Sequence, residues 1–281
     1  MGNDFHSALT DFSDKQLHNL RKKIKPDVAS DPEVAYKLQK RIQRFHAILW
    51  LLYDSEIYTT KKLRKYGDKY VSVKDQLRSL LSHQTQIDLL HEAEKDLGMQ
   101  FLFVHAYFSG LNDENVKQWK KTARKSLPKR KKILKALDKT LGKYGDPIDL
   151  AFAQAFLKSE YKVFLSQLDT EEETQMREAR NKIDYFIYLV QVLNVQFQIE
   201  INDATFAQTK ALQKVLRDWL RRDAFLNALT NYRQIHLKDG AFAMRGLEPL
   251  ETWALKLRES TYNQILSLSH GLPQKLEFKK D

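Results

Sequence analysis

Residues 34–52, VAYKLQKRIQRFHAILWLL, carry the clearest helical pattern in the first part of the chain. Their apolar side chains recur at steps of four, three, four and three residues, at Leu38, Ile42, Phe45, Leu49 and Leu52. This spacing places them on one face of an α-helix, where they can pack against a core. The preceding Asp31 and Pro32 are typical of a helix cap and a first helical position.

The rest of the chain follows the same kind of pattern. Only nine Gly and six Pro interrupt its 281 residues, and no segment alternates apolar and polar residues as a half-buried strand does. We therefore predict an all-α fold. Besides the helix around 34–53, the apolar spacing predicts a turn over 58–65, a short apolar core plug over 99–108, and helices over 14–25, 71–97, 148–168, 172–197, 204–235 and 247–268.

Composition limits the classes of function. The hydrophobic share of 42% supports one or two domains, and the absence of Cys excludes disulfides, thiolate zinc sites and a cysteine nucleophile. The N-terminus shows no basic region followed by an apolar stretch, so no signal peptide is expected. The longest apolar run, residues 47–53, is far shorter than the roughly 20 residues that span a membrane. We expect a cytoplasmic protein without a membrane span; the sequence specifies no oligomeric state.

Residues 115–143, NVKQWKKTARKSLPKRKKILKALDKTLGK, concentrate the charge. They hold twelve Lys or Arg and one acid, a surplus equal to the formal net charge of +11 of the whole chain. Val116, Trp119 and Leu127 form an apolar stripe before Pro128, and Leu137 and Leu141 continue one after it. The segment is therefore predicted to be two anchored amphipathic pieces, with Trp119 in the core. Its charged face is either a solvated helix surface or a site for a polyanion.

An internal repeat relates the two halves of the chain. Residues 34–53 and 175–194 are each followed by a second long helix, with the sequences LRSLLSHQTQIDLL at 77–90 and LQKVLRDWLRRDAFLNAL at 212–229. In this arrangement the chain resembles the CHAD (conserved histidine α-helical domain) family. The resemblance implies two pseudo-symmetric antiparallel helical bundles. It also implies binding of inorganic polyphosphate through basic residues on the first helix of each bundle.

The family's basic positions are only partly kept here. In residues 175–193, QMREARNKIDYFIYLVQVL, Arg180 stands where the family has Arg and Tyr188 where it often has Tyr, while Arg177 replaces the His and Asp184 replaces the Lys. In residues 34–52 the three corresponding positions are Tyr36, Gln39 and Gln43, and only Arg44 and His46 retain basic character. A clean H-x-x-R-x-x-x-K occurs at His18, Arg21 and Lys25, although so short a motif also arises by chance.

Catalytic and metal-binding patterns are missing. The sequence contains no P-loop, no G-x-G-x-x-G and no H-E-x-x-H, so we expect no enzymatic activity, no cofactor and no metal. The division expected from the repeat is an N-terminal helical segment over 1–30, a first bundle over 31–170, a second bundle over 171–270 and a polar tail over 271–281.

The sequence therefore predicts non-enzymatic binding of polyphosphate or a similar polyanion. Two alternatives stay open: a helical RNA- or DNA-binding protein, and a degenerate CHAD scaffold that serves protein–protein interaction. The residues predicted to bind the polyanion lie mainly in the basic segment, with remnants of the family site as secondary candidates: Lys117, Lys120, Lys121, Arg124, Lys125, Lys129, Arg130, Lys131, Lys132, Lys135, Lys139, Arg177, Arg180, Arg44 and His46.

Overall fold

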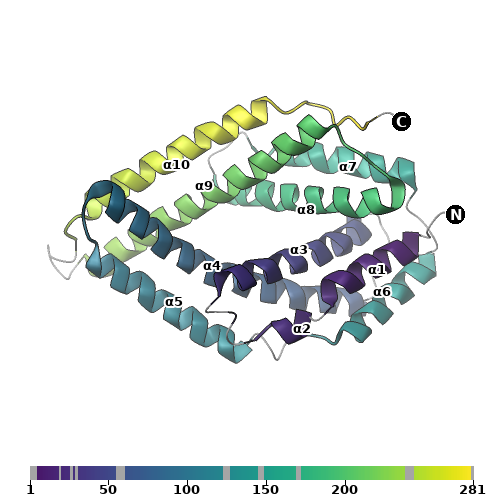
Figure 1. Cartoon of the computed structure of the whole chain (residues 1–281), viewed down its shortest axis with the longest axis horizontal. Helices are drawn as coiled ribbons and strands as arrows, with labels where there is room; N and C mark the ends of the chain where they lie inside the picture. Colours follow the sequence, from purple (N-terminus) through teal and green to yellow (C-terminus); the bar gives the residue numbers. More distant parts are fainter. Residues whose placement is uncertain are drawn as a thin grey trace.

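The computed structural model describes residues 5–18, 20–25, 28, 31–54, 61–122, 127–144, 149–168, 172–237 and 244–279. These residues form an all-α protein, which confirms the predicted fold class (Figure 1). Its helices in chain order are α1 (Phe5–Leu17), α2 (Leu20–Lys23), α3 (Pro32–Asp54), α4 (Lys61–Leu97), α5 (Leu102–Thr122), α6 (Arg130–Tyr144), α7 (Leu150–Leu165), α8 (Glu173–Phe197), α9 (Asp203–His236) and α10 (Leu247–His270).

The helix ends agree with several local sequence signals. The backbone N–H of Val34 donates to Asp31 Oδ1 at 3.0 Å, so Asp31 caps α3 as expected. Gly98, just after α4, has a φ of +62°, a left-handed conformation that a side chain would strain. Residues 127–129 are not helical, so Pro128 separates α5 from α6.

Three predicted elements differ from the structure. Helix α4 begins at Lys61 rather than near residue 71, and it includes residues 61–65 of the predicted turn; residues 58–60 lie outside the described residues. The predicted core plug over 99–108 leads into a longer helix, α5, in which Val104 and Phe108 are buried in the core as expected, whereas Leu102 and Phe103 are exposed. The predicted helix over 14–25 is divided, because α1 ends at Leu17 and α2 begins at Leu20.

The buried apolar side chains form two clusters. The larger cluster joins α1, α2, α3, α6, α7 and α8 with the first parts of α4 and α9 and the last part of α10; Trp119 belongs to it and is 2% exposed, as predicted. The smaller one joins the C-terminal parts of α4 and α9 with α5 and α10. Burying each large apolar side chain contributes roughly 1.5–3 kcal/mol, so both clusters hold their helices firmly.

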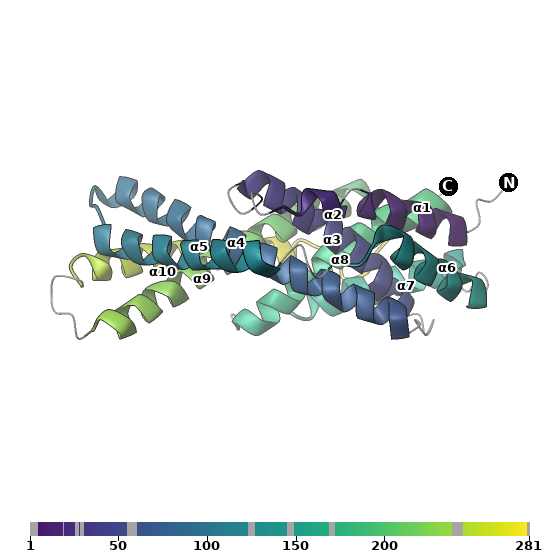
Figure 2. The ribbon, with the colours of Figure 1, turned by 90° about the horizontal axis from the view of Figure 1, so that it is seen from below.

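Helices α4 and α9 connect the two ends of an elongated molecule (Figures 1 and 2). One end contains the turn from α4 to α5 and the start of α10, and the other contains α1, α6 and α7 together with both termini (Figure 1). Both clusters contain residues from before and after residue 170. The division into two pseudo-symmetric bundles near that residue stays a prediction.

Candidate functional site

A groove lies between α3, α4, α8 and α9, at the level where α4 and α9 pass from the larger core cluster to the smaller one. Its first compartment has a volume of about 130 Å³. The residues that line it are Tyr36, Gln39, Arg78, Leu81, Ser82, Thr85, Arg177, Arg180, Arg217, Leu220, Arg221 and Ala224. Five of these are arginines and none is acidic, so we call the site the arginine groove.

The arginines of the first compartment come from three helices and are held by neutral or acidic partners at its rim. Arg78 Nη2 donates to Asn181 Oδ1 at 3.2 Å. Arg221 Nη1 lies 3.5 Å from Asp218 Oδ1. Burial lowers the pKa of Arg78, and the charges of Arg180 and Arg177 lower it further. Because a guanidinium keeps its proton in proteins, the arginines repel one another and favour an anion between them.

A second compartment of about 210 Å³ continues the arginine groove along α3, α8 and α9. It shares Tyr36, Arg180 and Arg217 with the first compartment and adds Lys40, Gln43, Arg44, Asp184, Ile187, Tyr188, Gln191, Lys210 and Gln213. Lys40, Arg44 and Lys210 outnumber the one acid in this part. The two compartments together form one continuous cationic site.

Asp184 organises the second compartment and is 5% exposed. Its carboxylate accepts hydrogen bonds from Gln43 Nε2, at 3.2 Å, and from Gln213 Nε2. Arg180 Nη2 lies 3.6 Å away, one helical turn before Asp184 on α8. Among the described residues, Nε of Arg180 and Nε of Arg44 are buried without a hydrogen-bond partner. The groove therefore holds cationic donors that its own side chains do not fully satisfy.

Tyr36 stands where the two compartments meet. Arg217 Nη1 donates to its hydroxyl group, and Lys40 Nζ lies 4.4 Å from the centre of its ring. Burial alone would raise the pKa of Tyr36, but hydrogen bonds and charges from Lys40 and Arg217 prevail and lower it. The ring and its two cations therefore lie at the junction of the two compartments and line both of them.

The structure brings Arg177, Arg180 and Arg44 into the arginine groove. His46 does not line it, because its ring is turned to α8, where Tyr185 Oη lies 2.7 Å from its Nδ1. Burial, followed by the charge of Lys74, lowers the pKa of His46 to about 4. At neutral pH His46 therefore adds no positive charge to the site.

Sequence reasoning missed four basic residues of the arginine groove, Lys40, Arg78, Lys210 and Arg217, whereas the neighbouring Arg221 and Arg222 stand out in the sequence as a small basic cluster. A usable signal was present, since Lys40 and Arg44 are four residues apart on α3, as are Arg217 and Arg221 on α9. Such pairs share one helix face. The two α9 arginines also lie in the second helix of the internal repeat.

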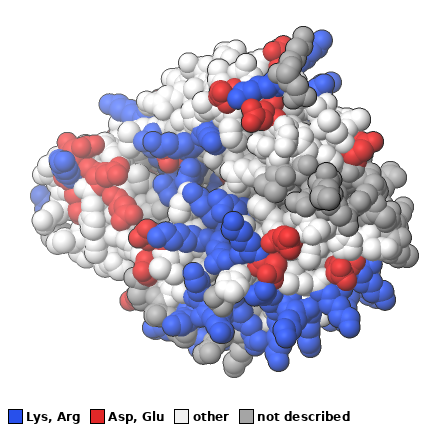
Figure 3. All heavy atoms as spheres, turned by 45° about the vertical axis from the view of Figure 1, so that its right-hand side comes forward, with Lys and Arg blue, Asp and Glu red and all other residues white. Residues whose placement is uncertain are grey.

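The basic segment forms a different kind of surface. Its described lysines are exposed and lie at the end of α5, before α6 and on α6. We call them the lysine surface: Lys117, Lys120, Lys121, Lys129, Lys131, Lys132, Lys135 and Lys139. Arg124 and Lys125 lie outside the described residues. Figure 3 shows one band of Lys and Arg across the middle of a face and a second, larger group along the lower edge.

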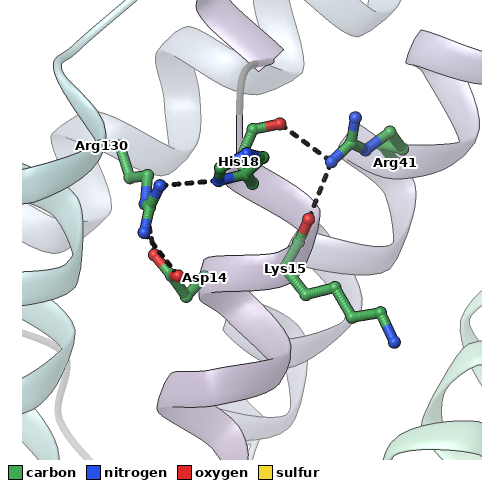
Figure 4. A network of polar contacts seen from close by, with 5 residues as sticks. All are labelled: Asp14, Lys15, His18, Arg41 and Arg130. Atoms are coloured by element: carbon green, nitrogen blue, oxygen red, sulfur yellow. Dashed lines mark hydrogen bonds and ion pairs between the residues drawn. The ribbon is translucent and has the colours of Figure 1, made fainter.

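Arg130, the remaining candidate of the segment, is engaged within the protein (Figure 4). Its guanidinium donates two hydrogen bonds to the carboxylate of Asp14, one of them, from Nη2 to Oδ2, at 2.6 Å. Its Nη1 lies 2.8 Å from His18 Nδ1. Arg130 therefore attaches α6 to the end of α1, and its charge is already matched by Asp14.

In the described part of the chain, no three His, Cys, Asp or Glu side chains are grouped to hold a metal ion. Among the described helices, none combines the length and apolar character that crossing a membrane requires.

Comparison with known proteins places the fold. No protein-family model matches the sequence, and no curated protein is significantly similar to it. Among solved structures, the crystal structure of the CHAD domain from the plant Ricinus communis matches with a TM-score of 0.68. The match covers 99% of this chain and 95% of that chain, at 12% sequence identity. The likeness to CHAD domains is therefore one of fold.

Proposed function

We propose that this protein binds inorganic polyphosphate or a similar linear polyanion, without catalysis, in the arginine groove. The observation that supports the proposal most is the first compartment, where five arginines from α4, α8 and α9 surround one space that no acid lines. Keeping so many like charges together costs free energy. An anion bound between them would recover that cost.

The chemistry of arginine fits a phosphate chain. A guanidinium presents its N–H donors in a planar fork that matches two oxygens of one phosphate group, and such charge-assisted hydrogen bonds are stronger than neutral ones. A linear chain carries charge along its length, which suits two compartments in series better than a single compact pocket. The cations continue from Arg221 through Arg217 to Lys210 and Arg44.

The CHAD fold is the second support. Members of the family that the sequence resembles are associated with polyphosphate binding through basic residues, and this chain shares their fold at low identity. Arg177 and Arg180, which occupy the family's basic positions on α8, both line the groove. The resemblance to the CHAD family and the geometry of the pocket therefore both favour the arginine groove as the binding site.

Nucleic acid is less well matched by the groove. Recognition of unpaired bases relies on aromatic faces that are open for stacking. Tyr36 has Lys40 over its ring, and Tyr188 has Arg44 at 5.6 Å from the centre of its ring. These contacts favour a ligand that offers phosphate oxygens. A protein-interaction scaffold would need no such concentration of arginine in a concave site.

The test is a double charge reversal, Arg217→Glu with Arg221→Glu. Hydrogen bonds to charged groups contribute about 1.5–3 kcal/mol each, so the variant should bind labelled long-chain polyphosphate about a hundredfold more weakly at low salt. Fluorescence anisotropy measures the affinity. Circular dichroism and thermal unfolding check that the variant is folded. The control, Arg245→Glu with Lys256→Glu, changes the net charge equally at exposed positions outside the groove and should keep most of the affinity.

Three outcomes would contradict the proposal. Equal weakening in the groove variant and the control would show that only net charge matters. No binding by the unaltered protein at low salt would favour the scaffold alternative. A single-stranded RNA of matched charge that displaces polyphosphate efficiently would favour the nucleic-acid alternative.

A further inference from the structure

The end of the molecule opposite both termini carries most of the exposed apolar side chains. It contains the turn from α4 to α5, the end of α9 and the start of α10 (Figure 1). Among the described residues, seven large apolar side chains are exposed, and five of these lie at this end. We call these five the apolar tip: Met99, Leu102, Phe103, Ile235 and Leu237.

Helices α5 and α9 meet at the apolar tip. The ring of Tyr107, one turn after Phe103 on α5, lies 6.1 Å from the ring of His236. Leu237 directly follows His236 at the end of α9. Leu102 and Leu237 are 70% and 67% exposed, so both side chains remain in water although the helices that carry them are in contact. An exposed apolar group of this kind marks an interaction site more often than a random surface does.

A hollow of about 300 Å³ lies beside the first turn of α5. Residues 99–104 and Arg245 line it. The segment before α10 packs closely against this turn, since a Cβ on Gly246 would lie only 3.1 Å from Met99 Cε. Gly246 also has a φ of +78°, which favours glycine. The apolar tip therefore offers a depression that can receive an apolar side chain of a partner, as the centres of protein interfaces do.

Acids outnumber bases around the apolar tip, although the chain as a whole has a formal net charge of +11. Five acids and three bases lie within residues 91–103, 230–237 and 244–252. Glu92 and Glu248 are exposed, and neither forms an ion pair with another described residue. Figure 3 shows acids gathered at the left edge of one face and bases along its lower edge. The two ends of the protein thus differ in the sign of their charge.

We propose that the apolar tip is a docking surface for a basic amphipathic helix of a partner protein. Such a helix places its apolar side chains on Leu102, Phe103 and Leu237 and its lysines or arginines beside the surrounding acids. Burial of the apolar side chains supplies most of the affinity, and the acids select the sign of the partner's charge. The proposal goes beyond polyphosphate binding and does not depend on it.

Charge distinguishes this occupant from two others. A second copy that docked through the same surface would bring its acids against those of the first copy, and like charges across an interface are unfavourable. An anionic membrane would present phosphate groups to the same acids, whereas protein surfaces that bind such membranes are rich in Lys and Arg. A basic helix is the occupant whose charge and apolar face both match.

The experiment uses a labelled synthetic helix of leucine and lysine, about 18 residues long, with its leucines on one face. Fluorescence anisotropy with the full chain measures its affinity. The tip variant, Leu102→Gln with Leu237→Gln, should bind the peptide about tenfold or more weakly, because both leucines leave water on docking. A second variant, Glu92→Gln with Glu248→Gln, should bind it about threefold more weakly at low salt and lose this difference at high salt.

The matched control, Leu150→Gln with Leu255→Gln, removes two leucines that are each 45% exposed outside the apolar tip, and it should keep the affinity. A leucine–glutamate peptide of the same design would be drawn to the basic surfaces, so the tip variant should bind it as the unaltered protein does. Circular dichroism checks folding. Polyphosphate affinity should stay unchanged in both tip variants, which keeps this test separate from that of the arginine groove.

Three results would overturn the inference. In the first, the tip variant binds the leucine–lysine peptide as well as the control does. In the second, sedimentation shows a dimer of the unaltered protein that the tip variant loses, which would assign the surface to a second copy. In the third, the unaltered protein floats with vesicles of phosphatidylcholine and phosphatidylglycerol and the tip variant does not, which would assign it to a membrane.

Discussion

The arginine groove and the lysine surface are both strongly basic, yet the protein builds them in opposite ways. The groove takes its arginines from α3, α4, α8 and α9, far apart in the sequence. The lysine surface comes from one continuous segment that ends in α6. The groove is concave and partly buried, whereas the surface is open. The density of charge along the sequence therefore indicates the lysine surface but gives no sign of the arginine groove.

The difference shows what burial adds to a charge. Asp184, Arg180 and Gln43 hold one another inside the molecule, so the groove has a defined geometry before any ligand arrives. Lysines of the other surface have long, mobile side chains in water. Preorganised donors lose less entropy on binding, and the groove should therefore dominate affinity.

The largest expected effect is on stability, at Asp184. Asp184→Ala removes a buried carboxylate from Arg180, Gln43 and Gln213. Breaking one side of a buried ion pair costs about 3–5 kcal/mol, because the remaining charge keeps its desolvation cost. Urea unfolding measures the decrease in stability. Asp184→Asn keeps the size and an acceptor oxygen and should be less destabilising. A decrease in the free energy of unfolding of less than about 1 kcal/mol would show that the contacts of Asp184 do not hold the groove in place.

The second effect is on the pH dependence of stability, through the buried side chain of His46. Burial lowers the pKa of His46 to about 4, below its ordinary value of about 6.5. The folded state therefore favours the neutral form of His46. The resulting contribution to stability, on the order of 3 kcal/mol, is fully present above pH 6.5 and is lost as the pH falls toward 4. Unfolding of His46→Gln at neutral pH and at about pH 5 should show a smaller difference than in the unaltered protein. Identical pH profiles would contradict this role.

A smaller effect is expected from exchanging Arg and Lys, and it should differ between the arginine groove and the lysine surface. Arg221→Lys keeps the charge of the groove but removes the planar fork, and should weaken polyphosphate binding by about tenfold. Lys132→Arg on α6 should change binding by less than about twofold, because an open surface does not orient the ligand. Anisotropy titrations under one salt condition test the pair. Equal responses would mean that both surfaces act only through charge.

The smallest expected effect is at the exposed ion pair between Asp14 and Arg130. The side chains of Arg130 and Asp14 are 42% and 32% exposed, and pairs of this kind contribute about 0–1 kcal/mol. Asp14→Ala should therefore lower the free energy of unfolding by no more than that amount. A large decrease in stability would show that this ion pair is essential for docking α1 on α6.

Much of the fold could be predicted from local patterns. The stripe from Leu38 to Leu52 identified α3, and Asp31 marked its start, because these signals act within a few residues of each other. The break between Leu17 and Leu20 and the exposure of Phe103 could not be seen, since both depend on which neighbours cover a helix. Arg177 and Arg180 were found through the repeat, but Arg78 was missed because its role depends on α8.

By itself, the sequence determined that the protein is all-α, that Trp119 is buried and that its excess charge lies over residues 115–143. These properties follow from apolar spacing and composition, which are local. The tertiary structure decided where charge becomes a site. It placed Arg78, Arg180 and Arg217 around one space, and it paired Arg130 with Asp14. The physical reason is that a binding site requires a convergence of side chains in three dimensions, and only the packing of α4 and α9 against α3 and α8 produces it.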